Sequence, residues 1–246
     1  MEKVQVRYRQ RGQELESKLV SLGEPQFLDP QTRLLALAAA ATASGRRDPT
    51  RVVLAIALAR GMGPEPLREA ILQTYLFAGY PRAINALAVL HSLLPQEDEG
   101  IPEVDLEPRS GETEMWAADG QTLCRQVYRD KYPSLLRTMA RLSPDLARWM
   151  VLEGYGKVLS RPHLPPLTRE LVAVAALIPL AVPDQLRAHL RGALFVGASE
   201  GAVREVIATV AVLGSAGVRS AETLVDLVVQ EFSEHGRRGA GEGGVP

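Results

Sequence analysis

The sequence predicts an all-α protein that consists of two tandem helical repeats. Ala, Leu and Val fill most of the apolar positions, and aromatic residues make up only 5% of the 246 residues, a composition that suits closely packed helices. Apolar residues recur at helical spacing, and no segment sustains the alternation of apolar and polar residues typical of a half-buried strand. A comparison of the chain with itself adds a third observation, since one helical pattern occurs twice.

Ten segments combine the apolar spacing of a helix with residues that start or end one. Asp29 is expected to cap the first of them, with Pro30 in its first turn. Ser143 and Ser199 are expected to start later helices, and Gly61 to end one. The predicted helices are residues 32–43, 51–60, 66–77, 81–94, 123–139, 143–158, 167–180, 184–196, 200–213 and 221–232.

Composition divides the chain into four parts. Residues 1–94 form a degenerate N-terminal repeat, whose first ten residues are expected to fray. An acidic linker rich in Pro and Gly covers 95–117, and the C-terminal repeat covers 118–233. The last part, 234–246, is rich in Gly and poor in apolar side chains, so we expect a flexible tail there.

The repeat is visible when the sequence is shifted by 136 residues against itself. Residues 28–72 then lie over residues 164–208 without a gap, and 16 of the 45 aligned positions are identical. Shared Ala and Leu are common in helical proteins, so the rarer identities carry the argument. These are Thr32 and Thr168, Arg33 and Arg169, Gly61 and Gly197, Arg68 and Arg204, and Glu69 and Glu205.

The differences between the repeats point to a site in the second one. Glu170 lies over Leu34, and His189 lies over Val53, so these two positions are ionisable only in the second repeat. Conversely, residues 75–81 of the first repeat contain aromatic side chains that the second repeat lacks. Two tyrosines of this segment either reach a pocket or, as we favour here, pack at a subunit interface; they are Tyr75 and Tyr80.

Bulk composition excludes several classes of function. The net charge of −1 provides no field that would attract nucleic acid or an anionic membrane. The longest apolar run, 171–182, contains Pro179 and is too short to cross a bilayer. The N-terminus lacks the apolar core of a signal peptide, so we expect a cytoplasmic protein. Cys124 is the single cysteine and the four histidines are scattered, so neither an intrachain disulfide nor a metal site is expected.

Four segments of the second repeat carry a specific resemblance. They are residues 156–164 (GKVLSRPHL), 168–171 (TREL), 185–194 (QLRAHLRGAL) and 204–206 (REV). Together with residues 61–87 of the first repeat, they resemble the carboxymuconolactone decarboxylase and AhpD-like family, over 24–94 and 118–230. The resemblance implies a small all-helical module that assembles into rings. A chain with two modules would then form a homo-oligomer, a trimer with pseudo-hexameric packing.

The AhpD-like branch of this family implies thiol peroxidase chemistry through a Cys-x-x-Cys pair flanked by a glutamate and a histidine. The glutamate falls on Glu170 and the histidine on His189, but Val182 and Gln185 occupy the two cysteine positions. Peroxide reduction by this route requires a thiolate and a resolving thiol, so the branch is disfavoured. Cys124 is expected to be a small buried hydrophobe.

The decarboxylase branch implies a reaction that needs neither a thiol nor a cofactor. Its chemistry requires a general acid or base and cations that hold a carboxylate. His189 suits the first role, with Glu170 either as its partner or in a structural ion pair with an arginine. Contacts with a small carboxylate substrate are expected from Arg161, Arg169, Arg187 and Gln185. Because Arg169 has a counterpart in the first repeat, a structural role is the favoured alternative for it.

Three functions therefore remain open at the level of sequence. The first is a cofactor-free lyase or isomerase that acts on a small carboxylate or lactone through a Glu170–His189 pair. The second is an AhpD-type alkylhydroperoxidase, a peroxiredoxin-like antioxidant protein. The third is a non-catalytic oligomeric binding protein, which the erosion of the first repeat favours.

Overall fold

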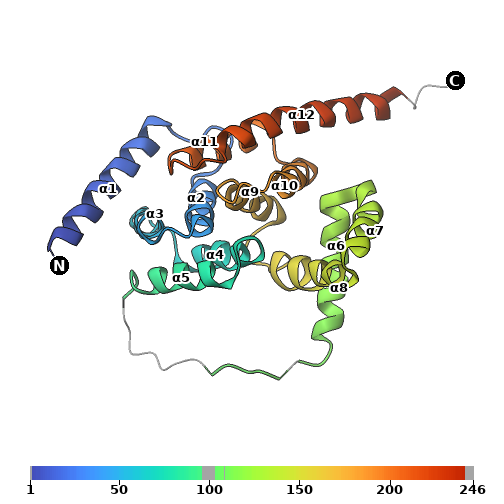
Figure 1. The fold of residues 1–246 in the computed structure, drawn as a ribbon, viewed down its shortest axis with the longest axis horizontal. Coiled ribbons are helices and arrows are strands. Elements are labelled where there is room, and N and C mark those ends of the chain that lie inside the picture. Colours follow the sequence, from blue (N-terminus) through green and yellow to red (C-terminus); the bar gives the residue numbers. More distant parts are fainter. Residues whose placement is uncertain (1, 96–102, 108, 242–246) are drawn as a thin grey trace.

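A computed structural model of the chain describes residues 2–95, 103–107 and 109–241, and within these ranges every regular element is a helix (Figure 1). The all-α class predicted from the sequence is confirmed. The helices are α1 (Glu2–Ser21), α2 (Pro30–Ser44), α3 (Arg47–Ala59), α4 (Pro64–Ala78), α5 (Tyr80–His91), α6 (Glu112–Tyr128), the 3-10 turn η1 (Arg129–Lys131), α7 (Tyr132–Leu142), α8 (Pro144–Trp149), the π-helix η2 (Met150–Leu159), α9 (Pro166–Leu177), α10 (Pro183–Phe195), α11 (Glu200–Ala211) and α12 (Val218–Gly241).

The predicted helix starts are confirmed by their caps. The Asp29 carboxylate accepts a hydrogen bond from the Thr32 backbone N–H at 2.8 Å, and Pro30 is the first residue of α2. The hydroxyls of Ser143 and Ser199 accept from backbone N–H groups three residues later. Each cap satisfies one of the N–H groups that the first turn of a helix leaves without a partner.

Three helices extend beyond the predicted ones. Helix α1 begins at Glu2, within the residues expected to fray, and α12 reaches Gly241, inside the predicted tail. Similarly, α6 begins at Glu112, inside the predicted linker 95–117. A helix that is anchored by buried side chains propagates at little cost beyond them, because nucleation has already occurred. Of the predicted linker and tail, residues 96–102, 108 and 242–246 lie outside the described residues.

The predicted helix 123–139 is two helices, α6 and α7, joined by η1. Arg129 has a positive φ of 48°, which no helical residue adopts, and so ends α6. Pro133 then occupies the first turn of α7, where its missing N–H leaves no bond unmade. The predicted helix 143–158 changes type at Met150, where α8 gives way to η2.

Helices α6 and η2 pack at very close range through two glycines. A Cβ atom on Gly120 would overlap the carbonyl oxygen of Val151, and one on Gly156 would overlap that of Trp116. The two contacts are reciprocal, because each helix offers a glycine to the backbone of the other. They fix η2 against α6 and thereby position the side chains that these two elements share with the candidate site.

The two repeats meet at a crossing of equivalent helices in the centre of the molecule (Figure 1). Helix α2 of the first repeat packs against α9 of the second, and both are rich in small buried residues. Ala36 and Ala40 of α2 belong to the core of the second repeat. Val172 and Ala176, their counterparts 136 residues later, belong to the core of the first. This exchange relates the repeats by a pseudo-twofold axis.

Two ion pairs follow the same pseudo-symmetry. Arg33 donates to Glu205 at 2.7 Å, and Arg169 donates to Glu69 at 2.8 Å. In each pair the arginine begins the central helix of one repeat and the glutamate belongs to the other repeat. The Thr-Arg and Arg-Glu identities in the sequence are therefore explained by a contact that the repeats make reciprocally.

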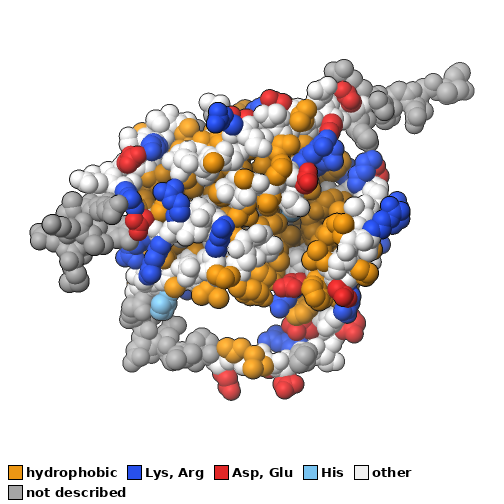
Figure 2. Space-filling model, viewed as in Figure 1, with side chains coloured by type: hydrophobic (Ala, Val, Ile, Leu, Met, Phe, Trp, Pro, Cys, Tyr) orange, Lys and Arg blue, Asp and Glu red, His pale blue; other side chains and the backbone are white. Residues whose placement is uncertain are grey.

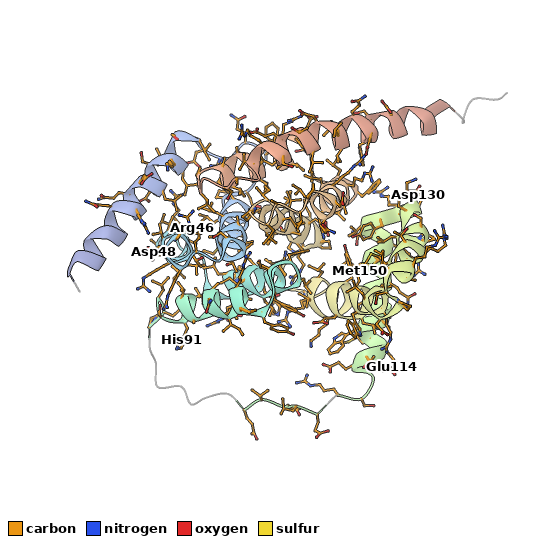
Figure 3. All side chains as sticks on the ribbon, viewed as in Figure 1. Arg46, Asp48, His91, Glu114, Asp130 and Met150 are labelled. Atoms are coloured by element: carbon orange, nitrogen blue, oxygen red, sulfur yellow. The ribbon has the colours of Figure 1, made fainter. Side chains whose placement is uncertain are left out.

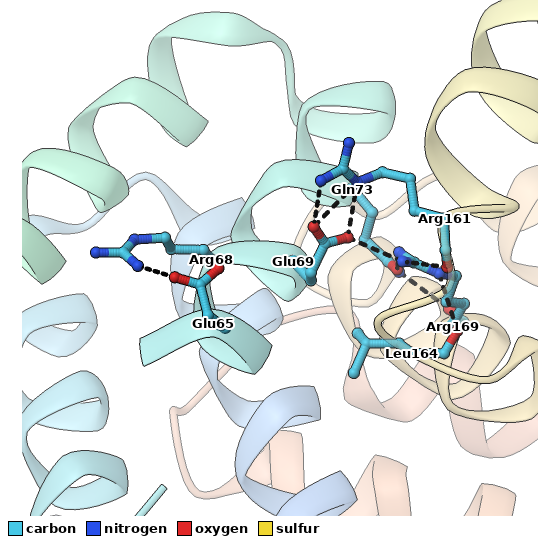
Figure 4. Close-up of polar contacts among 7 residues, drawn as sticks. All are labelled: Glu65, Arg68, Glu69, Gln73, Arg161, Leu164 and Arg169. Carbon is cyan, nitrogen blue, oxygen red and sulfur yellow. Dashed lines mark hydrogen bonds and ion pairs between the residues drawn. The ribbon is translucent and has the colours of Figure 1, made fainter. Parts of the chain in front are cut away.

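The Glu69 pair lies inside a larger polar cluster (Figure 4). Arg161 makes bidentate hydrogen bonds to Glu69, with both oxygens engaged at 2.8 to 3.1 Å. The Arg169 side chain is 1% exposed and also donates to Gln73 and to the carbonyl oxygens of Leu164 and Arg161. The buried guanidinium is thus paired and hydrogen-bonded, as a charge in a protein interior must be.

Removal of the Glu69 carboxylate should strongly destabilise the fold. Glu69→Ala leaves the Arg169 charge buried without a counterion, which typically costs about 3–5 kcal/mol. The free energy of unfolding from urea titration measures the loss. Glu65→Ala is the matched control, because Glu65 pairs with Arg68 on the exposed face of the same helix (Figure 4) and such pairs contribute at most about 1 kcal/mol. Equal effects of the two substitutions would contradict the assignment.

The same carboxylate should make stability depend on acid pH. Burial raises the pKa of Glu69, but the hydrogen bonds from Arg161 and Arg169 outweigh it and lower the pKa below the ordinary value of 4.5. The unfolded chain therefore binds the proton first as the pH falls, so the stabilisation is complete above the unfolded pKa and is lost through the lowered folded pKa. Between about pH 5 and pH 3, the urea midpoint of Glu69→Gln should fall less steeply than that of the unsubstituted protein. Parallel slopes would refute this origin.

A candidate acid–base site between the two repeats

Glu170 and His189 meet in the interior of the second repeat. Glu170 lies in the first half of α9, and His189 lies at the middle of α10. The Nδ1 atom of His189 is 2.9 Å from Oε2 of Glu170, a hydrogen-bond distance. The residues are 3% and 8% exposed, respectively. The contact gives the buried carboxylate a partner and leaves Nε2 as the ring nitrogen that Glu170 does not engage.

Two neighbours hold this pair in place. A Cβ atom on Gly192 would lie 2.7 Å from Oε2 of Glu170, so the absence of a side chain there allows the carboxylate to rest against α10. The ring of Phe77 contacts the His189 ring edge-on, with centroids 5.1 Å apart. The imidazole is thus restrained by a hydrogen bond and by a packed aromatic ring.

His189 faces a cavity of about 640 Å³ that both repeats line. Helix α10 forms one wall, the end of α4 and the start of α5 form a second, and α6–α8 with η2 complete it. Figure 2 shows hydrophobic side chains gathered on this side of the molecule, and Figure 3 places Met150 between the central helices and α6–α8. The lining residues are Tyr75, Leu76, Phe77, Tyr80, Tyr128, Leu135, Met139, Leu146, Trp149, Met150, Glu153, Gly154, Tyr155, Leu159, Asp184, Gln185, Ala188 and His189.

The charged groups that line the cavity are acidic. Glu153 and Asp184 supply two carboxylates, and among the described residues the lining contains neither Lys nor Arg. The Tyr75 hydroxyl is 2.9 Å from Glu153, and its ring stacks on Tyr80 with centroids 4.7 Å apart. Burial, together with the negative charge of Glu153, raises the pKa of Tyr75, so the hydroxyl stays protonated and donates to the carboxylate. Both tyrosines therefore line the cavity, whereas the interpretation favoured from the sequence was packing at a subunit interface.

A second pair of tyrosines lies beside the Glu170–His189 pair. The hydroxyls of Tyr128 and Tyr155 are 2.6 Å apart, and the rings meet edge to face. Burial raises the pKa of both phenols, and the negative charge of Glu170 raises it further. Both hydroxyls are therefore protonated at neutral pH and available as hydrogen-bond donors.

Cys124 is a buried apolar side chain with little thiolate character. It is fully buried in a cluster with Tyr132 and Tyr155. Burial and then the charge of Glu170 raise the pKa of the Cys124 thiol to about 12. A thiol in this state is a poor nucleophile at neutral pH.

Of the four side chains predicted to contact a substrate, the cavity lining includes Gln185 and none of the three arginines. Arg161 and Arg169 are held by Glu69, in the cluster of Figure 4. Arg187 lies on α10 and pairs with Glu231 of α12. Ion pairs that join helices engage all three arginines, so their expected contact with a carboxylate substrate stays a prediction.

Several lining residues were not found from the sequence. Tyr128, Trp149 and Glu153 lie on α6, α8 and η2, whose packing no local pattern revealed. The signal that was available is the aromatic segment 75–81 of the first repeat, which the second repeat lacks. It forms a wall of the site that belongs to the second repeat.

The first repeat contains a smaller hollow at the equivalent place. Its volume is about 150 Å³, and Arg46 lies in its lining, on the opposite side of the molecule from Met150 (Figure 3). Leu34 and Val53, which replace the acid and the imidazole, are buried in the core of this repeat. Residues that the 136-residue shift relates line the two hollows. These pairs are Glu14 and Met150, Lys18 and Gly154, Pro49 and Gln185, Val52 and Ala188, Val212 and Leu76, and Leu213 and Phe77.

Family comparison agrees with the two repeats. The model of the carboxymuconolactone decarboxylase family matches residues 14–92 and again residues 144–226, together more than half of the chain. The chain belongs to this family, and it carries two copies of the family's module.

The chain is similar to individual relatives that carry two different names. Peroxisomal protein 2 of Schizosaccharomyces pombe is 35% identical over 137 residues, which are 54% of this chain and 62% of the relative. The protein of the same name in Saccharomyces cerevisiae is 29% identical over 56% of this chain and 57% of its own length. The 4-carboxymuconolactone decarboxylase of Acinetobacter baylyi is 35% identical over 29% of this chain and 54% of its own length. The chain thus spans less than two thirds of each relative.

Two further features limit the kinds of site that the described residues form. Within the described ranges, no helix is both long and apolar enough to span a bilayer. The same residues contain no group of three or more His, Cys, Asp or Glu side chains arranged to hold a metal ion. The predicted cytoplasmic location stays a prediction, since the fungal relatives are named as peroxisomal.

Cys124 should be unreactive in the folded protein. With its pKa near 12 and no exposed surface, labelling by a disulfide reagent at pH 8 should be at least about a hundredfold slower than that of a free peptide thiol. Denaturation in guanidinium should restore rapid, stoichiometric labelling. Rapid labelling of the native protein would show instead that the thiol is accessible and would reopen thiol chemistry.

Proposed function

We propose that the protein is a cofactor-free acid–base enzyme, a lyase or isomerase in which His189 transfers a proton at a carbon next to a carbonyl group. The observation that carries the proposal is the buried hydrogen bond between His189 and Glu170 at the edge of a cavity. An ionisable pair placed in a cleft and isolated from solvent on one side is typical of a proton-transfer site.

We assign different tasks to the two residues. Glu170 accepts the hydrogen on Nδ1 of His189 and so fixes the tautomer in which Nε2 carries the lone pair. His189 lines the cavity whereas Glu170 does not, so the imidazole is the proton carrier and the carboxylate orients it. Glu170 also stabilises the imidazolium that forms when Nε2 takes up a proton.

The cavity favours an uncharged, largely apolar substrate. Its lining is aromatic and aliphatic, and its two charged groups, Glu153 and Asp184, repel an anion. Of the two expected substrate classes, a small carboxylate or a lactone, the cavity therefore favours a lactone or another neutral carbonyl compound. The name of the bacterial relative, 4-carboxymuconolactone decarboxylase, supports a lactone substrate. A carboxylate group on such a lactone would meet neither Lys nor Arg among the described residues of this cavity.

Thiol peroxidase chemistry receives no support from the site. The positions of the AhpD-type cysteines are Val182 and Gln185, and Cys124 is buried with a raised pKa. A peroxidatic cycle needs an exposed thiolate and a second thiol that resolves the sulfenic acid.

The proposal is tested with unsaturated lactones that isomerise on proton transfer. A β,γ-unsaturated γ-lactone is supplied as a matched pair, one with a free carboxylate substituent and one with its methyl ester. Formation of the conjugated product, followed by ultraviolet absorbance, should be faster with the ester. His189→Gln should lower kcat by about 10²–10⁴, the usual contribution of a general base, and Glu170→Gln should lower it less.

His163→Gln is the matched control, because His163 is an exposed loop residue outside the cavity. Turnover that survives His189→Gln unchanged would eliminate the acid–base pair. If neither lactone is turned over although hydroxyaryl ligands bind the cavity, the alternative of a non-catalytic binding protein is favoured.

A further inference from the structure

The hydroxyl pair of Tyr128 and Tyr155 is not used by the acid–base pair and is the polar feature of the cavity that the proposed function leaves unexplained. We propose that Tyr128 is a catalytic hydrogen-bond donor to the substrate oxygen on which negative charge develops, and that Tyr155 is the positioning residue that orients its hydroxyl. This inference rests on the proposed function and names the electrophilic half of the same site.

The fold brings Tyr128 to the reacting side of the cavity. Tyr128 is the last residue of α6, which ends there because Arg129 has a positive φ. The preceding residue, Val127, is close to the position where a Cβ of Gly192 would lie, one turn from His189 on α10. Tyr128 and His189 both line the cavity, and Glu170 contacts His189 while its charge acts on the Tyr128 phenol. The donor and the base therefore line the same cavity.

The allocation of hydrogens leaves one of them for a ligand. Each phenol carries one hydrogen, and the contact between the hydroxyls uses one of the two. Tyr155 is 3% exposed and sits behind Tyr128, which is only half-buried. When Tyr155 donates to Tyr128, the hydrogen of Tyr128 remains free to point into the cavity. A hydroxyl that accepts a hydrogen bond is also a stronger donor, because such bonds polarise one another.

The reaction step balances without any additional reagent. Nε2 of His189 takes the proton from the carbon next to the carbonyl, and the electron pair of the broken C–H bond forms the C=C bond of an enolate. The carbonyl π electrons move to oxygen, which accepts the hydrogen bond from Tyr128. Return of the same proton to another carbon regenerates neutral His189 and gives the isomer. A donor placed at a developing oxyanion in a site with little water typically contributes about 10²–10³ in kcat.

The other two tyrosines of the lining, Tyr75 and Tyr80, are less suited to this role. Tyr80 is 60% exposed, so water competes for its hydroxyl. Tyr75 donates its hydrogen to Glu153. The carboxylate of Glu153 also disfavours a negative charge that develops on a substrate oxygen nearby. Gln185 lies on the same helix as His189, one turn earlier, and is a neutral amide donor. Tyr128 is paired with another hydroxyl, which can supply a hydrogen to it, whereas the carboxylate beside Tyr75 can only accept one.

The experiment measures binding of 2-naphthol, a hydroxyaryl probe whose emission reports its hydrogen bonding, to the full chain. Tyr128→Phe should weaken the Kd at least about tenfold, as loss of one hydrogen bond to a polarised oxygen does. Tyr155→Phe should weaken it less, because the Tyr128 hydroxyl remains but is no longer oriented. Tyr132→Phe is the matched control, since Tyr132 is a buried phenol of the same cluster that does not line the cavity.

Kinetics of the lactone isomerisation supply the readout that a structural role would not move. Tyr128→Phe should lower kcat by about 10²–10³ with KM changed much less, and thermal unfolding should match that of Tyr132→Phe. His189→Gln should retain naphthol binding while losing turnover, so failure of the acid–base proposal and failure of this one are distinguishable. Equal naphthol affinity in Tyr128→Phe and the unsubstituted protein, or no saturable binding to the latter, overturns the assignment.

Discussion

Two buried arginine–glutamate pairs across the repeat boundary are the contacts on which the rest of the structure depends. Each guanidinium would be prohibitively unfavourable in the interior without the carboxylate that the other repeat provides. The pairs therefore tie the helix crossing at the centre to the orientation of both repeats. The cavity needs this orientation, because the segment Tyr75–Tyr80 of one repeat faces His189 of the other.

The two repeats contribute differently to this shared cavity. The first repeat lacks the acid and the imidazole, and α1 leaves only a small hollow at that position. It nevertheless keeps an aromatic segment at the end of α4 that serves the site of its neighbour. In the second repeat, α6 and α7 add side chains that have no counterpart in the first, and Gly154 stands where the first repeat has Lys18. The larger cavity follows from both changes.

Local sequence patterns predicted most of the helices, because periodicity, capping residues and the internal repeat are local or self-referential signals. The resemblance located Glu170 and His189, but it could not show that Arg169 forms an ion pair with Glu69, since that partner lies 100 residues away in the sequence. The Tyr128–Tyr155 contact was also out of reach, because it depends on the break at Arg129 and on the close glycine packing of α6 against η2. Tertiary proximity decided each of these cases.

The pseudo-twofold relation between α2 and α9 has a consequence for higher assembly. A single-module protein can use such a self-complementary face to pair with a second copy. Here that face is already consumed within one polypeptide, since Ala36 and Ala40 are buried against the neighbouring repeat and so are their counterparts. Any contact between chains must therefore use other surfaces. No exact sixfold ring can form, because the alternating modules are joined covalently and differ in sequence.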